Sequence, residues 1–241
     1  MNRIRRHLAC LSLLVAATGT VAGPAVAQKP TPIPITEVKA PQPTVPEIFT
    51  LEGEFVRVAY NNEGYVILGY RTANSSVGDE WMLLQAGVTL RRGVKYQTLL
   101  RDAFSLRTPD GKTIPLSTQK EYGLAGYLPA LNKRASMVRD SLNYFPVDAN
   151  RPCGFQLFAD LGNANSVSFD QVDLADNRAC VGRLFFKVPG GISTGQHWLV
   201  VKFAGSEVQV PFRILTKEEG KEFGKRWEEF KKALDDGLLN T

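Results

Sequence analysis

The sequence contains few of the side chains on which common catalytic and metal sites depend. Its 241 residues include two histidines and three cysteines, and beyond residue 27 only His197, Cys153 and Cys180 remain. A His-based triad or a usual zinc site needs more of these groups. The chain also lacks the Gly-x-Ser-x-Gly, P-loop and Rossmann patterns. We therefore predict a non-catalytic protein without a cofactor, and keep a hydrolase that uses two carboxylates as an alternative.

Excess charge is also scarce once the N-terminus is set aside. The formal net charge is +5, but Arg3, Arg5 and Arg6 lie in the first 27 residues, which contain no acid. The remainder holds 26 basic and 24 acidic residues. Nucleic-acid binding usually requires a clear excess of basic residues. The near balance predicts that the protein has no nucleic-acid partner.

Residues 1–27 have the pattern of a secretory signal peptide. Three arginines precede an apolar stretch from Leu8 to Ala17, which is too short to span a bilayer. Ala25-Val26-Ala27 then supplies the small-x-small pattern of a cleavage site. We predict a periplasmic or extracellular protein with no integral membrane span after cleavage. In such an oxidising compartment, Cys153 and Cys180 are expected to form one disulfide.

Proline is concentrated in the next segment, which we assign to a linker at 28–48. Six of the 14 prolines fall between Pro30 and Pro46. Proline fixes φ and removes a backbone donor, so the segment should be extended and without a core. It could be a tail, a spacer or a ligand for a groove.

Residues 49–215 show the alternation of apolar and polar residues that is typical of strands. In 207–214 the apolar residues are Val208, Val210, Phe212 and Ile214, and Pro211 predicts that this strand lies at an edge. A hairpin is expected around Asn61-Asn62-Glu63-Gly64, with residues that tolerate left-handed backbone at its turn. Further strands are expected at 81–90, 103–107, 113–116, 183–188 and 197–203, with a turn at Pro109–Lys112. Short strands without strand–helix alternation predict an antiparallel β-sandwich.

A helical insertion is expected at about 117–145. Leu131, Ala135, Val138, Leu142 and Phe145 recur at helical spacing, and they predict a helix over 130–142. We expect it to close one open end of the core.

The last part of the domain plan is a C-terminal amphipathic helix within 216–241. Thr216 and Glu219 have the spacing of a capping box. One apolar stripe follows at Phe223, Trp227, Phe230 and Leu234. This stripe packs on the domain, on a protein partner or on a second copy, and these residues are the candidate partner contacts.

One stretch rich in carboxylate and amide oxygens was considered as a calcium site, because hard cations prefer such ligands. Its spacing does not match an EF-hand loop, and Asp and Asn are also common turn residues. No metal site is assigned, and the candidate ligands are Asp160, Asn163, Asn165, Asp170, Asp173 and Asp176.

Three runs resemble bacterial secreted immunoglobulin-like domains of unknown function. Tyr65–Ser75 is similar to their extended strand followed by Asn-Ser, and Phe104–Lys112 to their strand that turns at Asp-Gly. Gly182–Pro189 matches their late Gly-x-Leu-x-Phe-x-Val-Pro strand. The resemblance spans about residues 50–215, whereas 116–153 and the C-terminal helix depart from it. It implies an immunoglobulin-like β-sandwich in the envelope or outside the cell, and it supplies no catalytic residues.

Together these features predict an exported, non-catalytic binding or accessory module of the bacterial cell envelope with a protein partner. Two alternatives remain open: the two-carboxylate hydrolase and a structural spacer that self-associates through the C-terminal helix. The oligomeric state is not predicted.

Overall fold

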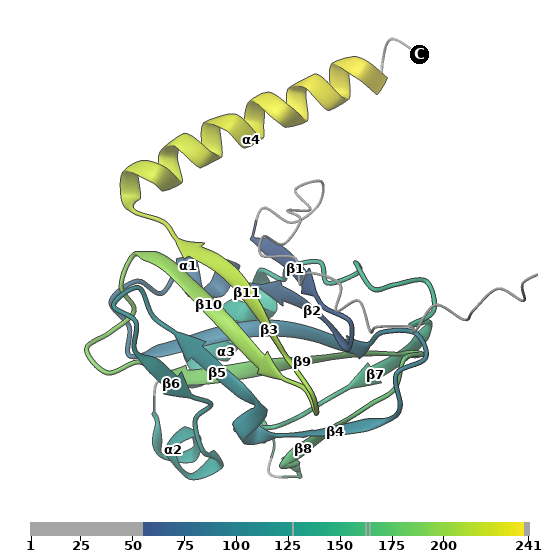
Figure 1. Cartoon of the computed structure of the whole chain (residues 1–241). Coiled ribbons are helices and arrows are strands. Elements are labelled where there is room, and N and C mark those ends of the chain that lie inside the picture. The colour runs from purple at the N-terminus through teal and green to yellow at the C-terminus, as the bar shows by residue number, and fades with distance from the viewer. Residues whose placement is uncertain (1–54, 127, 162, 164, 239–241) are drawn as a thin grey trace, which may run out of the picture. The chain divides into compact units, whose positions relative to one another are not determined.

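The chain is mainly β in the part that the structure describes (Figure 1). The computed structural model describes residues 55–126, 128–161, 163 and 165–238, all within the unit Ala40–Thr241. The predicted signal peptide at 1–27 and the predicted linker at 28–48 lie outside these residues.

Five strands form the larger sheet, in the order β1-β2-β3-β9-β7. Neighbouring strands are antiparallel, except that β7 runs parallel to β9. The strands are β1 (Val56–Tyr60), β2 (Gly64–Gly69), β3 (Trp81–Leu90), β7 (Arg151–Gly154) and β9 (Arg178–Lys187).

The second sheet has the order β11-β10-β5-β6 and is antiparallel throughout. A separate antiparallel pair joins β4 to β8. These strands are β4 (Gln97–Leu100), β5 (Phe104–Arg107), β6 (Thr113–Pro115), β8 (Gln171–Leu174), β10 (Gly195–Lys202) and β11 (Glu207–Ile214). The strands predicted from the sequence are present in the two larger sheets, whereas β4, β7 and β8 were not predicted.

The two larger sheets contribute to one hydrophobic core. In β11, Val208, Val210, Phe212 and Ile214 are buried, as the alternation predicted. β11 is also the last strand of its sheet, so the edge position expected from Pro211 is confirmed. The turn at Pro109–Lys112 is present, and Gly111 adopts a φ of +82° there.

The central strand β3 is buried on both faces, and so is its neighbour β9 at Leu184, Phe185 and Phe186. All ten residues of β3 are buried. In β9 the simple alternation predicted for 183–188 is wrong at Phe185, which is as buried as Leu184 and Phe186. The Phe185 ring lies 4.8 Å from the ring of Tyr122 and 5.0 Å from that of Phe158, measured between centroids. A strand that is apolar on both faces needs a cover on each.

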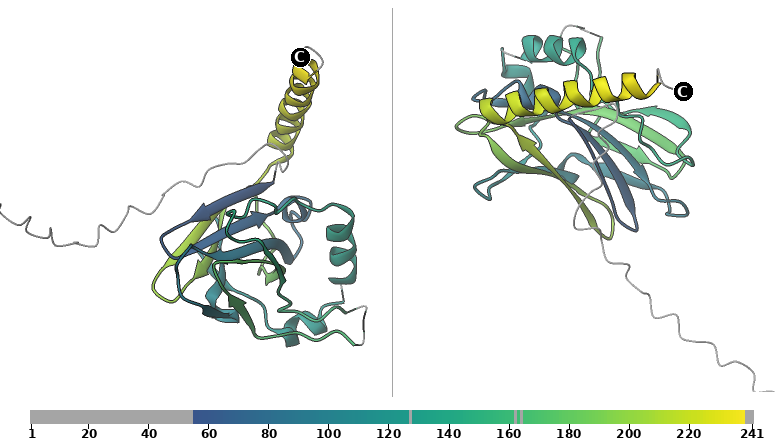
Figure 2. Two further views of the ribbon diagram at one scale, coloured as in Figure 1. Left: turned by 90° about the vertical axis from the view of Figure 1, so that its right-hand side faces the viewer. Right: turned by 90° about the horizontal axis from the view of Figure 1, so that it is seen from above.

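Helices supply part of the outer cover. Figure 2 shows α3 beside the larger sheet, on the side away from β10 and β11, and α3 contacts β3. The short α2 begins with a capping box between Thr118 and Glu121. The helices are α1 (Arg71–Asn74), the 3-10 turn η1 (Arg101–Ala103), α2 (Gln119–Leu124), α3 (Leu128–Met137) and α4 (Lys217–Leu238).

The helix predicted over 130–142 is only partly confirmed. α3 ends at Met137, and residues 138–150, which we call the strap, form no helix or strand. Leu142 and Phe145 supported the helical spacing, but both belong to the strap. Leu142 is buried against Val56, Val58 and Ile67 of β1 and β2, and Phe145 packs against the same cluster. Their burial therefore has a different cause, because the strap crosses the outer face of the sheet.

Two glycines let the strap approach the sheet closely. A Cβ at Gly69 would lie 2.8 Å from Asp140 Cβ, and a Cβ at Gly87 would lie 2.7 Å from Phe145 Cζ. The Tyr65 hydroxyl donates to the Tyr144 carbonyl at 2.8 Å. Strands β2 and β3 thus hold the strap by both packing and hydrogen bonding.

A buried ion pair fixes the start of the strap. Asp140 Oδ2 accepts from Arg71 N at 3.0 Å, and Asp140 Oδ1 accepts from Arg71 Nε at 3.1 Å. The Asp140 side chain is 1% exposed. Because Tyr70 gives α1 no side-chain cap, Asp140 satisfies the first backbone N–H of that helix.

In the hairpin between β1 and β2, Asn61 Oδ1 accepts from the N–H groups of Glu63 and Gly64, each at 2.8 Å. The expectation of left-handed backbone is wrong at Gly64, because its φ is not positive. A Cβ at Gly64 would lie 2.0 Å from the Phe203 ring, so close packing explains this glycine.

The predicted disulfide is confirmed between Cys153 and Cys180. The two cysteines are directly paired between the parallel strands β7 and β9, 27 positions apart in sequence. The bond therefore attaches the last strand of the larger sheet to its neighbour.

His197 lies in β10 and is fully buried. Its Nδ1 is 3.1 Å from the Gly195 carbonyl oxygen, its ring stacks on Phe212, and its Nε2 has no partner among the described residues. Burial lowers the pKa of His197, against smaller raising effects of the Gly195 carbonyl and the Asp110 charge. The folded protein therefore holds this ring neutral.

We expect a Cys153→Ser, Cys180→Ser double variant to lose about 3 kcal/mol of unfolding free energy, because the unfolded chain gains the entropy of the opened loop. Urea denaturation measures the loss. As a control, a reductant should destabilise the parent to a similar extent and leave the variant unchanged. Equal stability of variant and parent would contradict the prediction.

We expect Gly87→Ala to destabilise the fold by roughly 1–3 kcal/mol, because the new methyl group must displace the Phe145 ring. In a Phe145→Ala background the same substitution should have a clearly smaller effect. Gly123→Ala in α2 is the matched control: its Cβ meets nothing within 4 Å, so it should raise stability by up to about 1 kcal/mol. Equal losses in both backgrounds would show that Phe145 does not press on Gly87.

We expect the free energy of unfolding to fall as the pH is lowered from 7 to 5. The unfolded chain takes up a proton at the ordinary histidine pKa of about 6.5, whereas folded His197 resists protonation. The contribution is complete above that pH and is lost below it, by at most about 1.4 kcal/mol per pH unit. His197→Phe keeps a ring beside Phe212 and should flatten this part of the profile. Identical slopes in urea titrations of variant and parent would refute the assignment.

Candidate functional site

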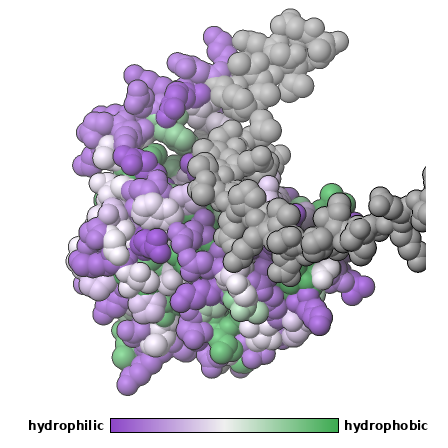
Figure 3. All heavy atoms as spheres, in the orientation of Figure 1, coloured by the Kyte–Doolittle hydropathy of each residue, from purple (hydrophilic) through white to green (hydrophobic). Residues whose placement is uncertain are grey.

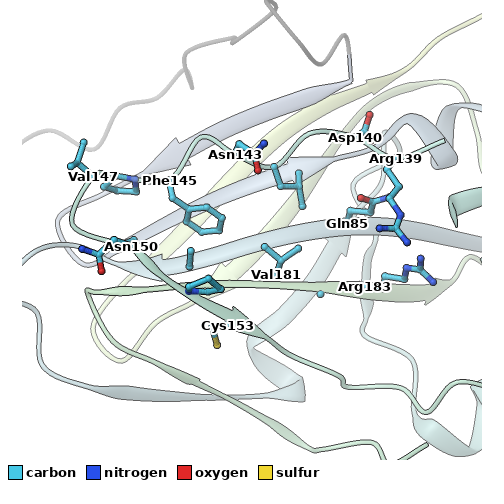
Figure 4. Close-up of a pocket in the computed structure, with 16 residues that line it drawn as sticks. Gln85, Arg139, Asp140, Asn143, Phe145, Val147, Asn150, Cys153, Val181 and Arg183 are labelled. Carbon is cyan, nitrogen blue, oxygen red and sulfur yellow. The ribbon is translucent and has the colours of Figure 1, made fainter. Parts of the chain in front are cut away.

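A groove of about 760 Å³ lies between the strap and the outer face of β3, β9 and β7 (Figure 4). The strap forms one wall, and the sheet forms the floor. By contrast, the face seen in Figure 3, where its atoms are coloured by hydropathy, is largely hydrophilic with scattered apolar residues. The groove is therefore the candidate site.

Strand register determines what the floor presents. Gln85 of β3 is paired directly with Arg183 of β9, and Gly87 is paired with Val181. Alternate residues of a strand share a face, so Arg183, Val181 and Ala179 follow one another along the groove. β7 contributes Pro152, the partner of Ala179.

Two guanidinium groups lie together at one end of the groove. Figure 4 shows Arg139 of the strap and Arg183 of β9 side by side, close to Gln85. Arg139 forms no ion pair or hydrogen bond with any residue that the structure describes. Asp140 lines the same groove but already holds Arg71. The charge of Arg139 therefore has no ion-pair partner among the described residues.

Arg183 is held in position by α3. It donates to Asn132 Oδ1 at 3.1 Å and to Ser136 Oγ at 3.2 Å. Burial lowers the pKa of Arg183, and the charge of Arg139 lowers it further, while Tyr122 and Asp160 act in the opposite direction. Arginine remains charged at neutral pH despite such a shift. The partly buried Arg183 and the exposed Arg139 together favour binding of an anion.

The middle and far end of the groove are apolar. Figure 4 shows Phe145 and Val181 at the centre, with Val147 beyond them. Val147 is 95% exposed and Val181 is 38% exposed. Pro146 and Pro152 extend this lining.

Three side-chain amides also line the groove, at Gln85, Asn143 and Asn150. None of them forms a side-chain hydrogen bond within the described ranges. Gln85 is only 9% exposed, so its amide faces little except the groove. Each amide can both donate to a ligand and accept from it.

A second hollow of about 860 Å³ lies beside β6, and three of the charged residues that line it have partners there, whereas the Lys187 ammonium has none among the described residues. Lys112 Nζ is 2.7 Å from Asp110 Oδ2, and Glu121 is engaged in its capping box. The bond to Lys112 and another to Thr108 lower the pKa of Asp110 to about 2. This hollow therefore offers a ligand one ammonium group, whereas the strap groove offers two guanidinium groups beside an apolar centre.

The predicted partner contacts on the C-terminal helix are placed in part. The Phe223 ring lies 5.3 Å from the ring of Phe55, between centroids, and the Trp227 ring has Lys231 Nζ 5.9 Å from its centroid. The side chains of Phe230 and Leu234 lie outside the described residues. Thr216 and Glu219 exchange the two hydrogen bonds of a capping box, at 2.9 and 3.2 Å. No described helix is long and apolar enough to cross a membrane.

The residues that the sequence offered as candidate calcium ligands are bonded to other groups and do not converge on one point. The Asp173 carboxylate accepts from Thr98 at 2.9 Å, Asp176 accepts from Gly93 N at 2.9 Å, and Asp170 lies 3.9 Å from Arg101. Asn163 Oδ1 accepts from Asn165 N at 3.0 Å. Among the described residues, no group of three or more His, Cys, Asp or Glu side chains could hold a metal ion. Asp160 lies near Arg183 and acts on its pKa.

Sequence reasoning missed Arg139, Arg183 and Gln85. One usable signal was Gln85, which interrupts the apolar run from Trp81 to Val88. A polar residue in the middle of a strand buried on both faces is often kept for a reason other than packing. Arg139 carried no such signal, because it lies within 130–142, where the sequence predicted a helix.

A comparison with protein-family models, with curated proteins and with solved structures finds no match to this chain.

Proposed function

We propose that the protein is an exported, non-catalytic binding module of the bacterial cell envelope, built on an immunoglobulin-like β-sandwich. Its binding site is the strap groove, and its ligand carries an anionic group next to an apolar part. The observation that carries this proposal is the unpaired guanidinium of Arg139 beside the partly buried Arg183, in a groove with an apolar centre.

Electrostatics favour an anion at this end of the groove. Bringing two guanidinium groups together is unfavourable, and an anion between them turns repulsion into two attractive contacts. The floor restricts access of water to Arg183, so the interaction is screened less than at an open surface. The same pair disfavours cationic ligands.

Two features support a binding role over a carboxylate hydrolase. A hydrolase of that type needs two acids that face one substrate, one of them free to exchange a proton. Asp140 is the one carboxylate among the described residues that line the groove, and it is held in an ion pair with Arg71. The disulfide is compatible with an exported protein.

We expect a simple carboxylate to bind at the guanidinium end. Hexanoate titrated into the purified protein should shift the arginine Nε–H signals of Arg139 and Arg183 in NMR spectra, with saturation. Arg139→Gln should weaken binding by about tenfold, because one of the two guanidinium contacts to the carboxylate is lost. Arg92→Gln is the matched control, since Arg92 lies in the turn after β3 and does not line the groove. Non-saturable shifts, or equal weakening by both variants, would contradict the proposal.

A further inference from the structure

We infer that the natural ligand of the strap groove is the C-terminal end of an extended peptide, with its free carboxylate at Arg139 and Arg183. This inference rests on the proposed function and names the ligand class. Three features of the groove support it: the alternation of residues along its floor, the side-chain amides without described partners, and the position of the two arginines at one end with apolar residues beyond them.

The floor has the periodicity of an extended chain. Arg183, Val181 and Ala179 are alternate residues of β9 that line the groove. From Ala179 to Arg183 the strand rises by about 13 Å, at 3.3 Å per residue. An extended peptide of about four residues covers the same length. Its side chains also alternate with period two, so they can meet this floor in step.

The cationic end matches a carboxylate. A guanidinium forms two parallel hydrogen bonds to a carboxylate, and Arg139 has all of its N–H groups free of described partners. Arg183 donates once from each terminal nitrogen to α3, which orients its plane and leaves further N–H groups for a ligand. Gln85, paired with Arg183, can donate to the same carboxylate.

The amides account for the peptide groups. An extended peptide brings N–H and C=O groups that need partners when water is displaced. Gln85, Asn143 and Asn150 lie at separate places along the groove, and each can donate and accept (Figure 4). A fatty acid would leave the buried Gln85 amide without a partner, which disfavours a purely hydrocarbon ligand.

The apolar centre accounts for a side chain near the carboxylate. Val181 is two residues from Arg183 along β9, beside the Phe145 ring over Gly87. A ligand whose carboxylate binds at Arg183 therefore places an apolar side chain from one of its last two residues near Val181. Valine and leucine are of suitable size, and the rim residue Val147 adds contact area.

The test uses fluorescently labelled hexapeptides that end in valine or leucine, each as the free acid and as the C-terminal amide. Fluorescence anisotropy is measured with the parent, Arg139→Gln, Val181→Ser and the control Arg92→Gln. Circular dichroism and thermal melts establish that each variant is folded. The acids should bind the parent and Arg92→Gln at least about tenfold more tightly than the amides. This preference should vanish in Arg139→Gln, and Val181→Ser should weaken both forms while the preference persists.

The outcomes separate the two proposals. If hexanoate binds, but the peptides do not bind or bind equally as acids and amides, the peptide inference is overturned and the proposed function stands. Failure of both peptides and hexanoate to bind overturns the two together. Tight binding of acids that persists unchanged in Arg139→Gln would place the carboxylate elsewhere and also overturn the inference.

Discussion

The position of the strap over the larger sheet depends on the bonds between Asp140 and Arg71. The Asp140 carboxylate is buried over Gly69, and it accepts from both the backbone N–H and the side chain of Arg71. The strap has no helix or strand of its own, so side chains alone must hold it in place. The ion pair fixes its start, and the packing of Phe145 over Gly87 fixes its middle. Removing Asp140 would leave the first backbone N–H of α1 without this acceptor and would break the link between the strap and Arg71. Loss of Asp140 would therefore release the strap and expose the apolar residues of β1 and β2 beneath it.

The need for such a layer follows from β3 and β9, which are apolar on both faces. The second sheet covers one face, while α2, α3 and the strap cover the other only in part. Leu83 and Phe185, which are paired across the two strands, are buried, whereas Arg183 and Val181 remain partly exposed. The groove occupies this gap in the cover. A site here needs no loop of special design, because it arises where the covering segments do not meet.

Local sequence patterns were sufficient to predict the strands that have one face exposed to solvent. The hairpin of β1 and β2, the edge strand β11 and the turn at Gly111 were all predicted from alternation and turn residues. The local patterns gave a wrong prediction where residues are buried by contacts with segments distant in the sequence. Leu142 and Phe145 continued the helical spacing of apolar residues, yet contacts across the sheet bury Leu142 fully and Phe145 partly. The four-residue strands β4, β7 and β8 are too short for a period to be visible, and β7 contains Pro152 and Gly154. The groove could not be predicted either, because it joins residues of β3, β9 and the strap.

The two arginines do not have equal standing as evidence for a ligand. Arg183 has a structural explanation, because it bonds to Asn132 and Ser136 and so attaches α3 to the sheet. Arg139 has no such role among the described residues, and its charge makes Arg183 harder to keep protonated. If packing alone governed this position, a neutral residue would remove the repulsion without loss of any described bond. An anion bound by both guanidinium groups would replace this repulsion with attraction. Arg139 is therefore the residue that points most directly to a ligand, because none of its described contacts stabilises the fold.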